Sequence, residues 1–294
     1  MRFEKGLAVL AAAVIAASAV TVTAFAAGTK VPITEKYFPD ENFREYVSQF
    51  DTNKNGYLSQ KERDAVTEIN IWYPDYDKQI CSLAGVGYFQ NLEKLECSGN
   101  RLTKLNVSKN TKLEELNCGE NQIAKLDISK NILLKEVSCS MNELTSLDVS
   151  RNTKLESLVC NWNKLTELDV SRNTGLRSLE CMANEISALD VSNNKKLKYF
   201  SCSRNKLTEL DVSKHTELYW FECGHNGLTE IDVSKSTGLY LFDCSGNDLT
   251  KLDVSRNTEL SVLDCEGNRL TELDISNCAD GILMHCDEGV KVKK

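Results

Sequence analysis

The sequence predicts a β-rich α/β solenoid, an elongated coil of stacked repeats, and three observations support this fold class. Cysteine recurs every 21 residues along most of the 294-residue chain. These cysteines share the consensus Leu-x-x-Leu-x-Cys-x-x-Asn, and a fixed period of about 20 to 50 residues is typical of solenoids. Only three prolines occur, all before residue 75, as expected where continuous strand ladders need every backbone N–H.

The repeat begins at Leu92 and recurs nine times, to about residue 280. Its consensus is L-x-x-L-x-C-x-x-N-x-L-T-x-L-D-V-S-x-N-T-x. Because the second half resembles the first, we expect two similar half-turns in each coil, with Leu, Cys and Val pointing inward. A single coil could not bury these side chains, so stacking must supply the core. The in-register cysteines are Cys97, Cys118, Cys139, Cys160, Cys181, Cys202, Cys223, Cys244, Cys265 and, after the last full repeat, Cys286.

Two asparagine columns follow the same period, one starting at Asn100 and a less strict one at Asn110. An inward Asn can both donate and accept hydrogen bonds, so it can satisfy backbone groups that a tight chain reversal leaves unpaired. His215 occupies one position of the second column. We therefore expect two Asn ladders along the solenoid, and we interpret His215 as part of a ladder.

The motif formed by Leu92, Leu95, Cys97 and Asn100 resembles that of bacterial leucine-rich-repeat proteins, of the 21-residue class, over about residues 80–290. The resemblance implies a right-handed leucine-rich-repeat coil of about nine repeats. It also implies a protein–protein interaction role, often at the cell surface or with a host.

The N-terminal segment has the features of a secretory signal. Arg2 and Lys5 precede an apolar stretch from Leu7, and small residues surround a cleavage position after Ala26. An uncleaved signal-anchor is the alternative, because the stretch is long enough to span a membrane. We expect export, to the exterior or the cell surface of a bacterium, with no membrane span left after cleavage. The expected organisation is a signal peptide (1–26), a helical N-terminal cap (27–79), an atypical first coil (80–91), nine repeats (92–280) and a C-terminal cap (281–294).

Within the N-terminal cap, residues 51–62 match the EF-hand calcium-loop pattern D-x-[DN]-x-[DN]-G-x5-E in full. Gly56 permits the sharp turn, and Glu62 can close the shell with both oxygens. With only two charged ligands, we expect weak binding, on the order of 10⁻⁴ to 10⁻³ M, in a structural role. The alternative is an ordinary turn-rich surface loop. The candidate ligands are Asp51, Asn53, Asn55, Tyr57 (through its carbonyl), Ser59 and Glu62.

The cysteines and aspartates each allow a chemical and a structural interpretation. Disulfides along the ladder are conceivable in an exported protein, but in-register side chains point side by side, and Cys packs well as a small hydrophobe. We favour buried free thiols, and a Cys278–Cys286 disulfide stays open. Further metal sites are one interpretation of the Asp column, but we favour a solvated row that makes local turn hydrogen bonds with Ser two residues on. This column contains Asp127, Asp148, Asp169, Asp190, Asp211, Asp232, Asp253 and Asp274.

Deviations from the repeat indicate a binding face. Strand alternation sends the third and fifth residues of each repeat outward. The third position is polar in five repeats and then apolar in four, while the fifth becomes acidic in Glu222, Asp243 and Asp264. Such an exposed apolar stripe suggests a binding surface, and cross-strand stacking that only stabilises the sheet is the alternative. The candidate partner-binding residues are Tyr199, Tyr219, Trp220, Tyr240, Leu241 and Val262.

Composition narrows the function further. A formal net charge of −8 argues against nonspecific nucleic-acid binding. Only three His residues are present, without a nucleophile at a recognisable spacing, so we expect no enzymatic activity. The favoured function is an exported, non-enzymatic recognition scaffold for a protein partner, with a glycan ligand also conceivable. The alternatives are a secreted inhibitor or accessory subunit of an enzyme, or a structural envelope protein.

Overall fold

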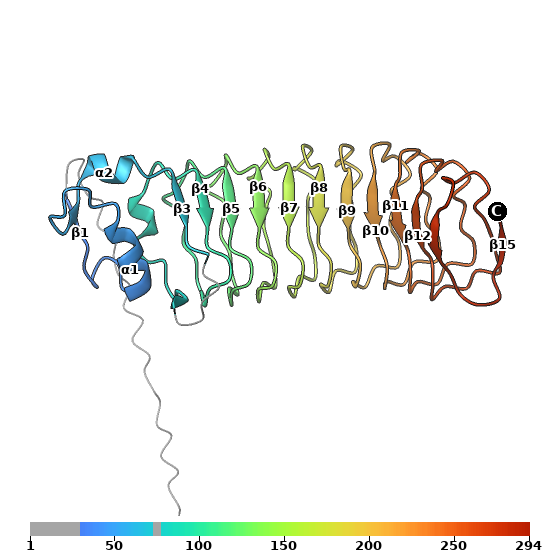
Figure 1. Ribbon diagram of the computed structural model, residues 1–294, viewed down its shortest axis with the longest axis horizontal. Coiled ribbons are helices and arrows are strands. Elements are labelled where there is room, and N and C mark those ends of the chain that lie inside the picture. Colours follow the sequence, from blue (N-terminus) through green and yellow to red (C-terminus); the bar gives the residue numbers. More distant parts are fainter. Residues whose placement is uncertain (1–29, 73–77) are drawn as a thin grey trace, which may run out of the picture.

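The computed structural model describes residues 30–72 and 78–294, which form an elongated solenoid with a small cap at the N-terminal end (Figure 1). This confirms the predicted fold class. The predicted signal peptide, residues 1–26, lies outside the described residues. No helix within the described ranges combines the length and apolar character needed to cross a membrane.

One parallel sheet runs along almost the whole solenoid. It has 11 strands in the order β14-β12-β11-β10-β9-β8-β7-β6-β5-β4-β3. Apart from β13, each strand lies one coil after its neighbour, so the order of the sheet follows the order of the chain. The strands are β3 (Glu68–Asn70), β4 (Lys94–Glu96), β5 (Glu115–Asn117), β6 (Glu136–Ser138), β7 (Ser157–Val159), β8 (Ser178–Glu180), β9 (Tyr199–Ser201), β10 (Trp220–Glu222), β11 (Leu241–Asp243), β12 (Val262–Asp264) and β14 (Leu283–His285).

The core is made of equivalent residues stacked from coil to coil. The middle residue of each strand from β3 to β12 is buried, as are the Leu at the start of each repeat and the Val or Ile of its second half. In three successive coils the middle residue is Phe: the rings of Phe200 and Phe221, and those of Phe221 and Phe242, stack with centroids 5.4 Å apart. These three phenylalanines are fully buried, which confirms that they belong to the core.

The first coil starts earlier than the sequence suggested. β3 lies within residues 27–79, which we had assigned to the cap, and Ile69 pairs in register with Leu95. Ile71 takes the position of the ladder cysteine, because Asn100 Nδ2 donates to its carbonyl. The return half of this coil is the segment predicted as atypical, residues 80–91. Four of its apolar residues are buried: Ile80, Leu83, Val86 and Phe89.

The first Asn ladder satisfies the chain reversal at both ends of its amide. Asn121 Nδ2 donates to the carbonyls of Cys97, Cys118 and Gly119. Its Oδ1 accepts from the N–H of Leu102 in the preceding coil, at 2.9 Å. The expected donor and acceptor roles are therefore confirmed for this column, which ties each coil to the one before it.

The second Asn ladder only donates. Asn152 Nδ2 donates to the carbonyls of Ile128 and Asn131 in preceding coils, while its buried Oδ1 has no hydrogen-bond partner among the described residues. His215 stands in this column, with Nε2 3.1 Å from the Val191 carbonyl. This confirms that His215 is a ladder residue. Cys278 takes the same position in the last repeat, a placement that we had not predicted.

The two half-turns of a coil differ despite their similar sequences. The half that ends in Cys forms the sheet, whereas the half that ends in Val or Ile shows only one isolated bridge outside the named strands in the described ranges, between Leu105 and Leu126. Between the halves, the chain turns through a left-handed residue, for example Gly99 at φ 68° and Trp162 at φ 54°. The two half-turns are therefore similar in the residues they bury, as expected, but they differ in backbone hydrogen bonding.

The N-terminal cap covers the open end of the core. It contains a short antiparallel pair, β1 (Val31–Pro32) and β2 (Tyr57–Leu58), and two helices, α1 (Glu41–Ser48) and α2 (Gln60–Asp64). Asp40 caps α1 through Oδ1 and accepts from the N–H groups of Cys81 and Ser82 through Oδ2. A 3₁₀ turn, η2 (Val86–Tyr88), follows in the first coil.

The C-terminal segment closes the other end. β14 keeps the register of the sheet, with Met284 opposite Leu263. A separate parallel pair joins β13 (Glu272–Asp274) to β15 (Lys291–Lys293). The residues after 280 therefore form the expected degenerate closing coil, and the lysines on β15 lie on an exposed strand, where charge discourages further pairing.

All cysteines of the described residues are free thiols, including Cys278 and Cys286. The nine from Cys97 to Cys265 are fully buried. Burial raises the pKa of these thiols, for Cys265 to about 12. The preferred interpretation, a core of free thiols, is therefore the one that the structure shows.

We predict that a maleimide reagent labels the native protein at Cys81, the exposed thiol, while the nine buried thiols react only after denaturation. The thiolate is the reactive form, and both burial and the raised pKa suppress it. Mass spectrometry of native and denatured samples checks this, with Cys81→Ser as the control that should lower the native count by one. Rapid native labelling of several ladder thiols would contradict the buried core.

Candidate functional site

The predicted apolar stripe is continuous on the outer face of the sheet. Tyr199 pairs in register with Trp220, Trp220 with Leu241, and Leu241 with Val262. One residue was missed: Leu283 on β14 pairs with Val262 and is 57% exposed. Its coil lacks the Leu and Asn markers, but the in-register Cys286 places Leu283 at the same position as Val262, so the sequence carried the signal that we missed. We call this row, from Tyr199 to Leu283, the apolar column.

Two tyrosines from the residue before each strand extend the apolar column sideways. Tyr219 stacks on Tyr240 with ring centroids 5.2 Å apart, and it meets Tyr199 edge-on at 6.2 Å. Cross-strand stacking, the structural alternative, therefore does occur here. It leaves both rings open to solvent, however, with Tyr219 42% and Tyr240 38% exposed. The cross-strand contacts therefore cover only part of the tyrosine side chains, and the rest of their surface is available to a ligand.

A hollow of about 400 Å³ lies beside these rings, lined by Lys198, Tyr199, Glu217, Tyr219 and Gly238, among others. A side chain at Gly238 would meet no atom within 4 Å. Three other repeats have Lys at the equivalent position, namely Lys112, Lys154 and Lys196. Gly238 thus borders the hollow without filling it, which sequence reasoning did not detect.

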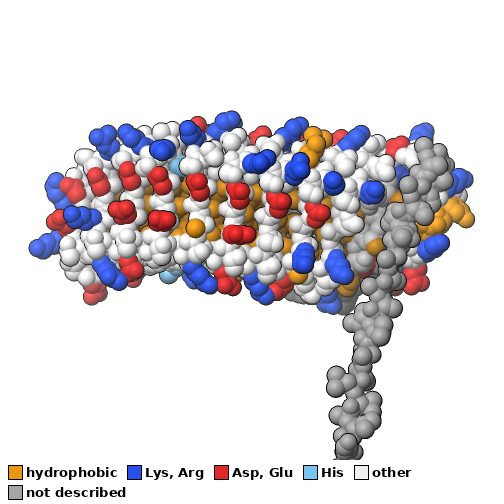
Figure 2. Space-filling model, turned by 180° about the vertical axis from the view of Figure 1, so that it is seen from behind, with side chains coloured by type: hydrophobic (Ala, Val, Ile, Leu, Met, Phe, Trp, Pro, Cys, Tyr) orange, Lys and Arg blue, Asp and Glu red, His pale blue; other side chains and the backbone are white. Residues whose placement is uncertain are grey.

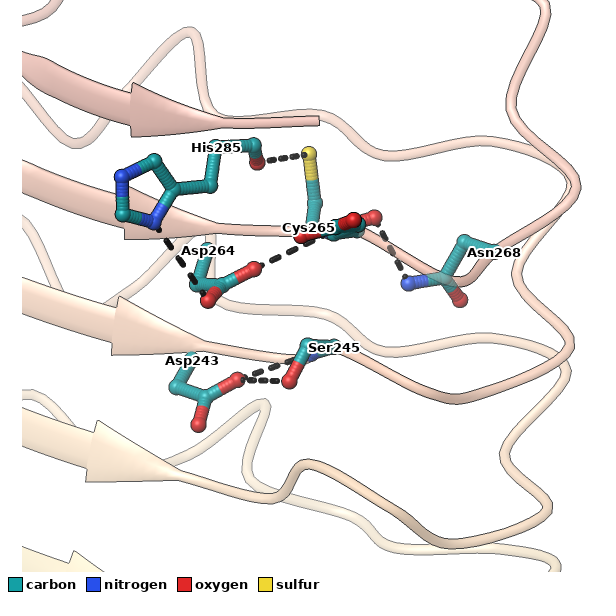
Figure 3. A network of polar contacts seen from close by, with 7 residues as sticks. Asp243, Ser245, Asp264, Cys265, Asn268 and His285 are labelled. Carbon is teal, nitrogen blue, oxygen red and sulfur yellow. Dashed lines mark hydrogen bonds and ion pairs between the residues drawn. The ribbon is translucent and has the colours of Figure 1, made fainter. Parts of the chain in front are cut away.

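An acidic row runs parallel to the apolar column. Glu222, Asp243 and Asp264 are register partners on β10, β11 and β12, and His285 continues the row on β14. Figure 3 shows the side chains of Asp243, Asp264 and His285 on neighbouring strands, with His285 Nδ1 3.7 Å from Asp264 Oδ2. We call Glu222, Asp243 and Asp264 the acidic row.

The Asp column on the opposite side of the solenoid makes the expected turn hydrogen bonds. In all eight coils Oδ1 accepts from the N–H of Ser two residues on, at 2.8 to 3.0 Å. At Asp211 the Ser213 hydroxyl, and then its N–H, hold the pKa of the carboxyl below its usual value. Figure 2 shows acidic side chains spaced along this back face, with basic side chains gathered towards its edges. The solvated, turn-forming interpretation of this column is confirmed.

The predicted calcium loop is an ordered turn between α1 and α2. Asp51 is buried, and its carboxylate accepts from the N–H groups of Asn55 and Gly56. Asn55 Oδ1 accepts from the N–H of Tyr57. Asn53, Asn55 and Tyr57 are exposed, whereas Ser59 is half-buried.

Glu62 is held by the loop's own donors. Its Oε1 accepts from the N–H and hydroxyl of Thr52 and from Asn53 Nδ2, and its Oε2 accepts from the N–H and hydroxyl of Ser59. Ser59 and Glu62 also form a capping box for α2, a role that the Ser-x-x-Glu spacing signals and that we did not predict. These hydrogen bonds, from the Ser59 hydroxyl above all, lower the pKa of Glu62 to about 2.

The oxygens of this loop suit a hard cation, with one rearrangement. Carboxylate, amide, hydroxyl and carbonyl oxygens are the ligands that calcium takes, and Glu62 is ionised above about pH 2. Asn53, however, turns its amide nitrogen towards Glu62, so that amide must rotate to offer its oxygen. Within the described ranges, no three His, Cys, Asp or Glu side chains lie close enough together to hold a metal ion, so neutral oxygens would have to complete the shell.

Comparison with solved structures identifies the type of repeat. The functional domain of InlJ from Listeria monocytogenes, a structure that includes a cysteine ladder, is 32% identical over 91% of this chain and 62% of that chain, with a TM-score of 0.72. This chain is a leucine-rich-repeat protein. Two other neighbours show the fold alone: internalin InlF of Listeria monocytogenes (23% identical, 90% of this chain and 79% of that chain, TM-score 0.75) and a leucine-rich-repeat protein of Leptospira interrogans (20%, 72% and 57%, TM-score 0.65).

A scan against protein-family models finds no match, and a sequence search of the curated proteins finds none either. The chain spans about 62% of the InlJ domain. The comparisons therefore identify the leucine-rich-repeat coil, and the function of this chain has to be argued from its own face and loop.

We predict that the Glu62 carboxylate stabilises the N-terminal cap in a pH-dependent way. Because folding lowers its pKa from 4.5 to about 2, its contribution is present above about pH 4.5 and is lost as the pH falls towards 2. In calcium-free buffer the parent should therefore melt higher than Glu62→Gln at neutral pH, and the gap should close below pH 4.5. Melting curves at a series of pH values check this. A gap that does not change with pH would contradict the assignment.

Proposed function

We propose that this chain is an exported, non-enzymatic recognition scaffold that binds a protein partner through the C-terminal half of its sheet face, in an interaction at the cell surface or with a host. The observation that supports this most is the apolar column, a row of five exposed or half-exposed apolar side chains on adjacent strands. Large exposed apolar patches on soluble proteins are typical of interaction sites.

The composition of the face favours a protein ligand. Aromatic residues, Tyr and Trp above all, are enriched where interfaces gain most of their affinity. In the apolar column, Trp220 lies between Tyr199 on one adjacent strand and Leu241 on the other. The hollow beside Gly238 offers a site for one anchoring side chain of the partner.

The histidines support a role without catalysis. His215 is buried in the second Asn ladder. The His285 side chain faces Asp264. The carbonyl of His285 accepts from Sγ of Cys265, a buried thiol. A His–Asp pair without an accessible nucleophile lacks the arrangement that covalent catalysis uses.

We predict that changing Tyr199, Trp220 and Tyr240 together to Ser abolishes partner binding without unfolding the protein. The exposed rings contribute to an interface, whereas the buried residues hold the fold. Affinity capture from the surroundings in which the organism grows, compared between parent and variant, measures this. The native state of each variant is checked by circular dichroism and melting.

The matched control changes the same outward column in the polar half of the sheet: Lys94→Ser, Glu115→Ser and Glu136→Ser. This control should capture the same partners as the parent. Equal capture by the aromatic variant would disprove the site. Capture of an enzyme that loses activity on binding would favour the inhibitor alternative instead.

For the N-terminal cap, we propose that the loop of residues 51–62 binds calcium weakly as a structural clip. Asp51, Asn53, Asn55, Tyr57, Ser59 and Glu62 would hold the ion. The support is the complete match to the loop pattern together with the buried side chains of Asp51 and Glu62 at its two ends. The ion would fix the turn between α1 and α2, and so the orientation of the cap on the first coil.

We predict that about 10 mM calcium stabilises the parent by about 1.4 to 2.7 kcal/mol, for a dissociation constant between about 10⁻³ and 10⁻⁴ M. Glu62→Gln should lose this stabilisation, because a neutral amide cannot close the shell. Thermal melting with calcium or a chelator measures it, and Glu68→Gln, on the exposed side of β3, is the control that should still respond. A parent whose melting temperature ignores calcium would refute the clip.

A further inference from the structure

Within the described part of the chain, the acidic row on β10, β11 and β12 has no Lys or Arg partner, whereas several other acids on and beside the sheet form salt bridges with Lys. On β4 and β5, Lys94 Nζ lies 2.8 Å from Glu115 Oε2. In the residue before each strand, Lys135 Nζ lies 2.5 Å from Glu114 Oε2. Among the described residues, no Lys or Arg lies within ion-pair distance of the acidic row, whose one salt bridge is that of Asp264 with His285.

Other acids of the same outward position also find amide donors. Glu96 accepts from Asn117 Nδ2 at 2.8 Å, and Glu180 accepts from Asn161 Nδ2 at 3.0 Å. Among the described residues, Asp243 accepts only from the N–H and hydroxyl of Ser245 in its own turn, and Asp264 accepts from the N–H of Glu266, while His285 Nδ1 lies 3.7 Å from Asp264 Oδ2 (Figure 3). These carboxylates thus retain unused acceptor capacity that faces outward.

Three carboxylates in direct register are unfavourable for the sheet itself. Glu222 lies opposite Asp243, and Asp243 opposite Asp264, on parallel strands about 4.8 Å apart. Like charges at opposed positions destabilise a sheet, and all three residues are half-buried, which weakens solvent screening. A cationic partner surface would remove this repulsion.

We propose that the partner presents a cationic amphipathic helix, which lies along the solenoid axis with apolar side chains on the apolar column and Lys or Arg over the acidic row. This inference rests on the proposed binding function of the same face. The acidic row lies two residues along each strand from the apolar column, about 6.6 to 6.8 Å away. The face therefore shows two adjacent stripes, one apolar and one negative, and the helix supplies their complements.

The spacing of the strands favours a helix over an extended segment. Three successive strands of the sheet span about 9.6 Å along the solenoid. On a helix, residues i, i+4 and i+7 share one face and rise about 10.5 Å. In an extended segment, residues i, i+2 and i+4 share one face and span about 13 Å. A helix therefore brings one basic side chain to each carboxylate, whereas an extended chain drifts out of step.

The probe is a synthetic helical peptide of about 18 residues, with a Leu stripe beside a Lys stripe and a fluorescent label. Two reference peptides accompany it: one with Glu in place of Lys, and one with the same composition in scrambled order. Binding to the full chain is measured by anisotropy. Trp220 reports the location when it is the only one of the three tryptophans left, in a Trp72→Phe, Trp162→Phe background; both replaced side chains are exposed.

The decisive variant neutralises the acidic row with isosteric amides: Glu222→Gln, Asp243→Asn and Asp264→Asn. We expect about tenfold weaker binding of the Lys peptide and a weaker dependence on salt, since three ion pairs with the peptide are lost. The matched control, Asp148→Asn, Asp169→Asn and Asp190→Asn, removes the same number of charges from turns of the same kind on the back face. It should bind like the parent.

The outcomes separate the two proposals. The cationic helix is overturned if the Lys peptide fails to bind at up to about 1 mM. It is equally overturned if the Glu or scrambled peptide binds as tightly, or if the amide variant keeps full affinity. If the Tyr199, Trp220 and Tyr240 Ser variant binds the Lys peptide as well as the parent does, the face itself is not the site and the proposed function fails. Loss of binding in that variant alone supports the face but not the charge assignment.

Discussion

The hydrogen bonds between coils are the constraint on which the rest of this structure depends. A coil of 21 residues cannot pair all of its own backbone hydrogen-bonding groups. The N–H and carbonyl groups at the chain reversal therefore bond to an adjacent coil or to a ladder Asn side chain. Asn121 shows how this is done: its amide donates to three carbonyls and accepts from the N–H of Leu102 in the preceding coil. The same need explains why the repeats lack Pro.

This constraint also decides what the cysteines do. Cys97 N donates to the Asn117 carbonyl and Cys97 O accepts from Asn121 Nδ2, so the residue there is fixed in backbone position, and its side chain is buried in the core. A free thiol fits as a small hydrophobe. In the first coil Ile71 takes the same place. The position therefore requires a buried apolar side chain, and the cysteines serve there by packing and not by thiol reactivity.

The parts of the structure that the period determines could be predicted from the sequence, and those that interrupt it could not. Register along a 21-residue period, combined with alternation in a strand, placed Tyr199, Trp220, Leu241 and Val262 side by side. Leu283 was missed although Cys286 keeps the register, because its coil lacks the Leu and Asn of the repeat. β3 was missed because an insertion separates Ile69 and Ile71 from the rest of their coil. The difference between the two half-turns of a coil could not be predicted for another reason. Their sequences are similar and both bury apolar side chains, so only the backbone geometry distinguishes them.

Function can then be sought where the repeat leaves a position free. Inward residues and ladder asparagines are fixed by packing, so variation among them is small and structural, as at His215. The outward positions tolerate any residue that a sheet accepts, and in the polar half some of their charges are compensated, as between Lys94 and Glu115. In the C-terminal half the same positions combine exposed aromatic surface with three uncompensated carboxylates in register. Neither feature helps the solenoid to fold, and the second opposes it. These features lower the stability of the fold but suit the binding of a cationic, apolar ligand. Binding of such a ligand is therefore the simplest explanation for their presence.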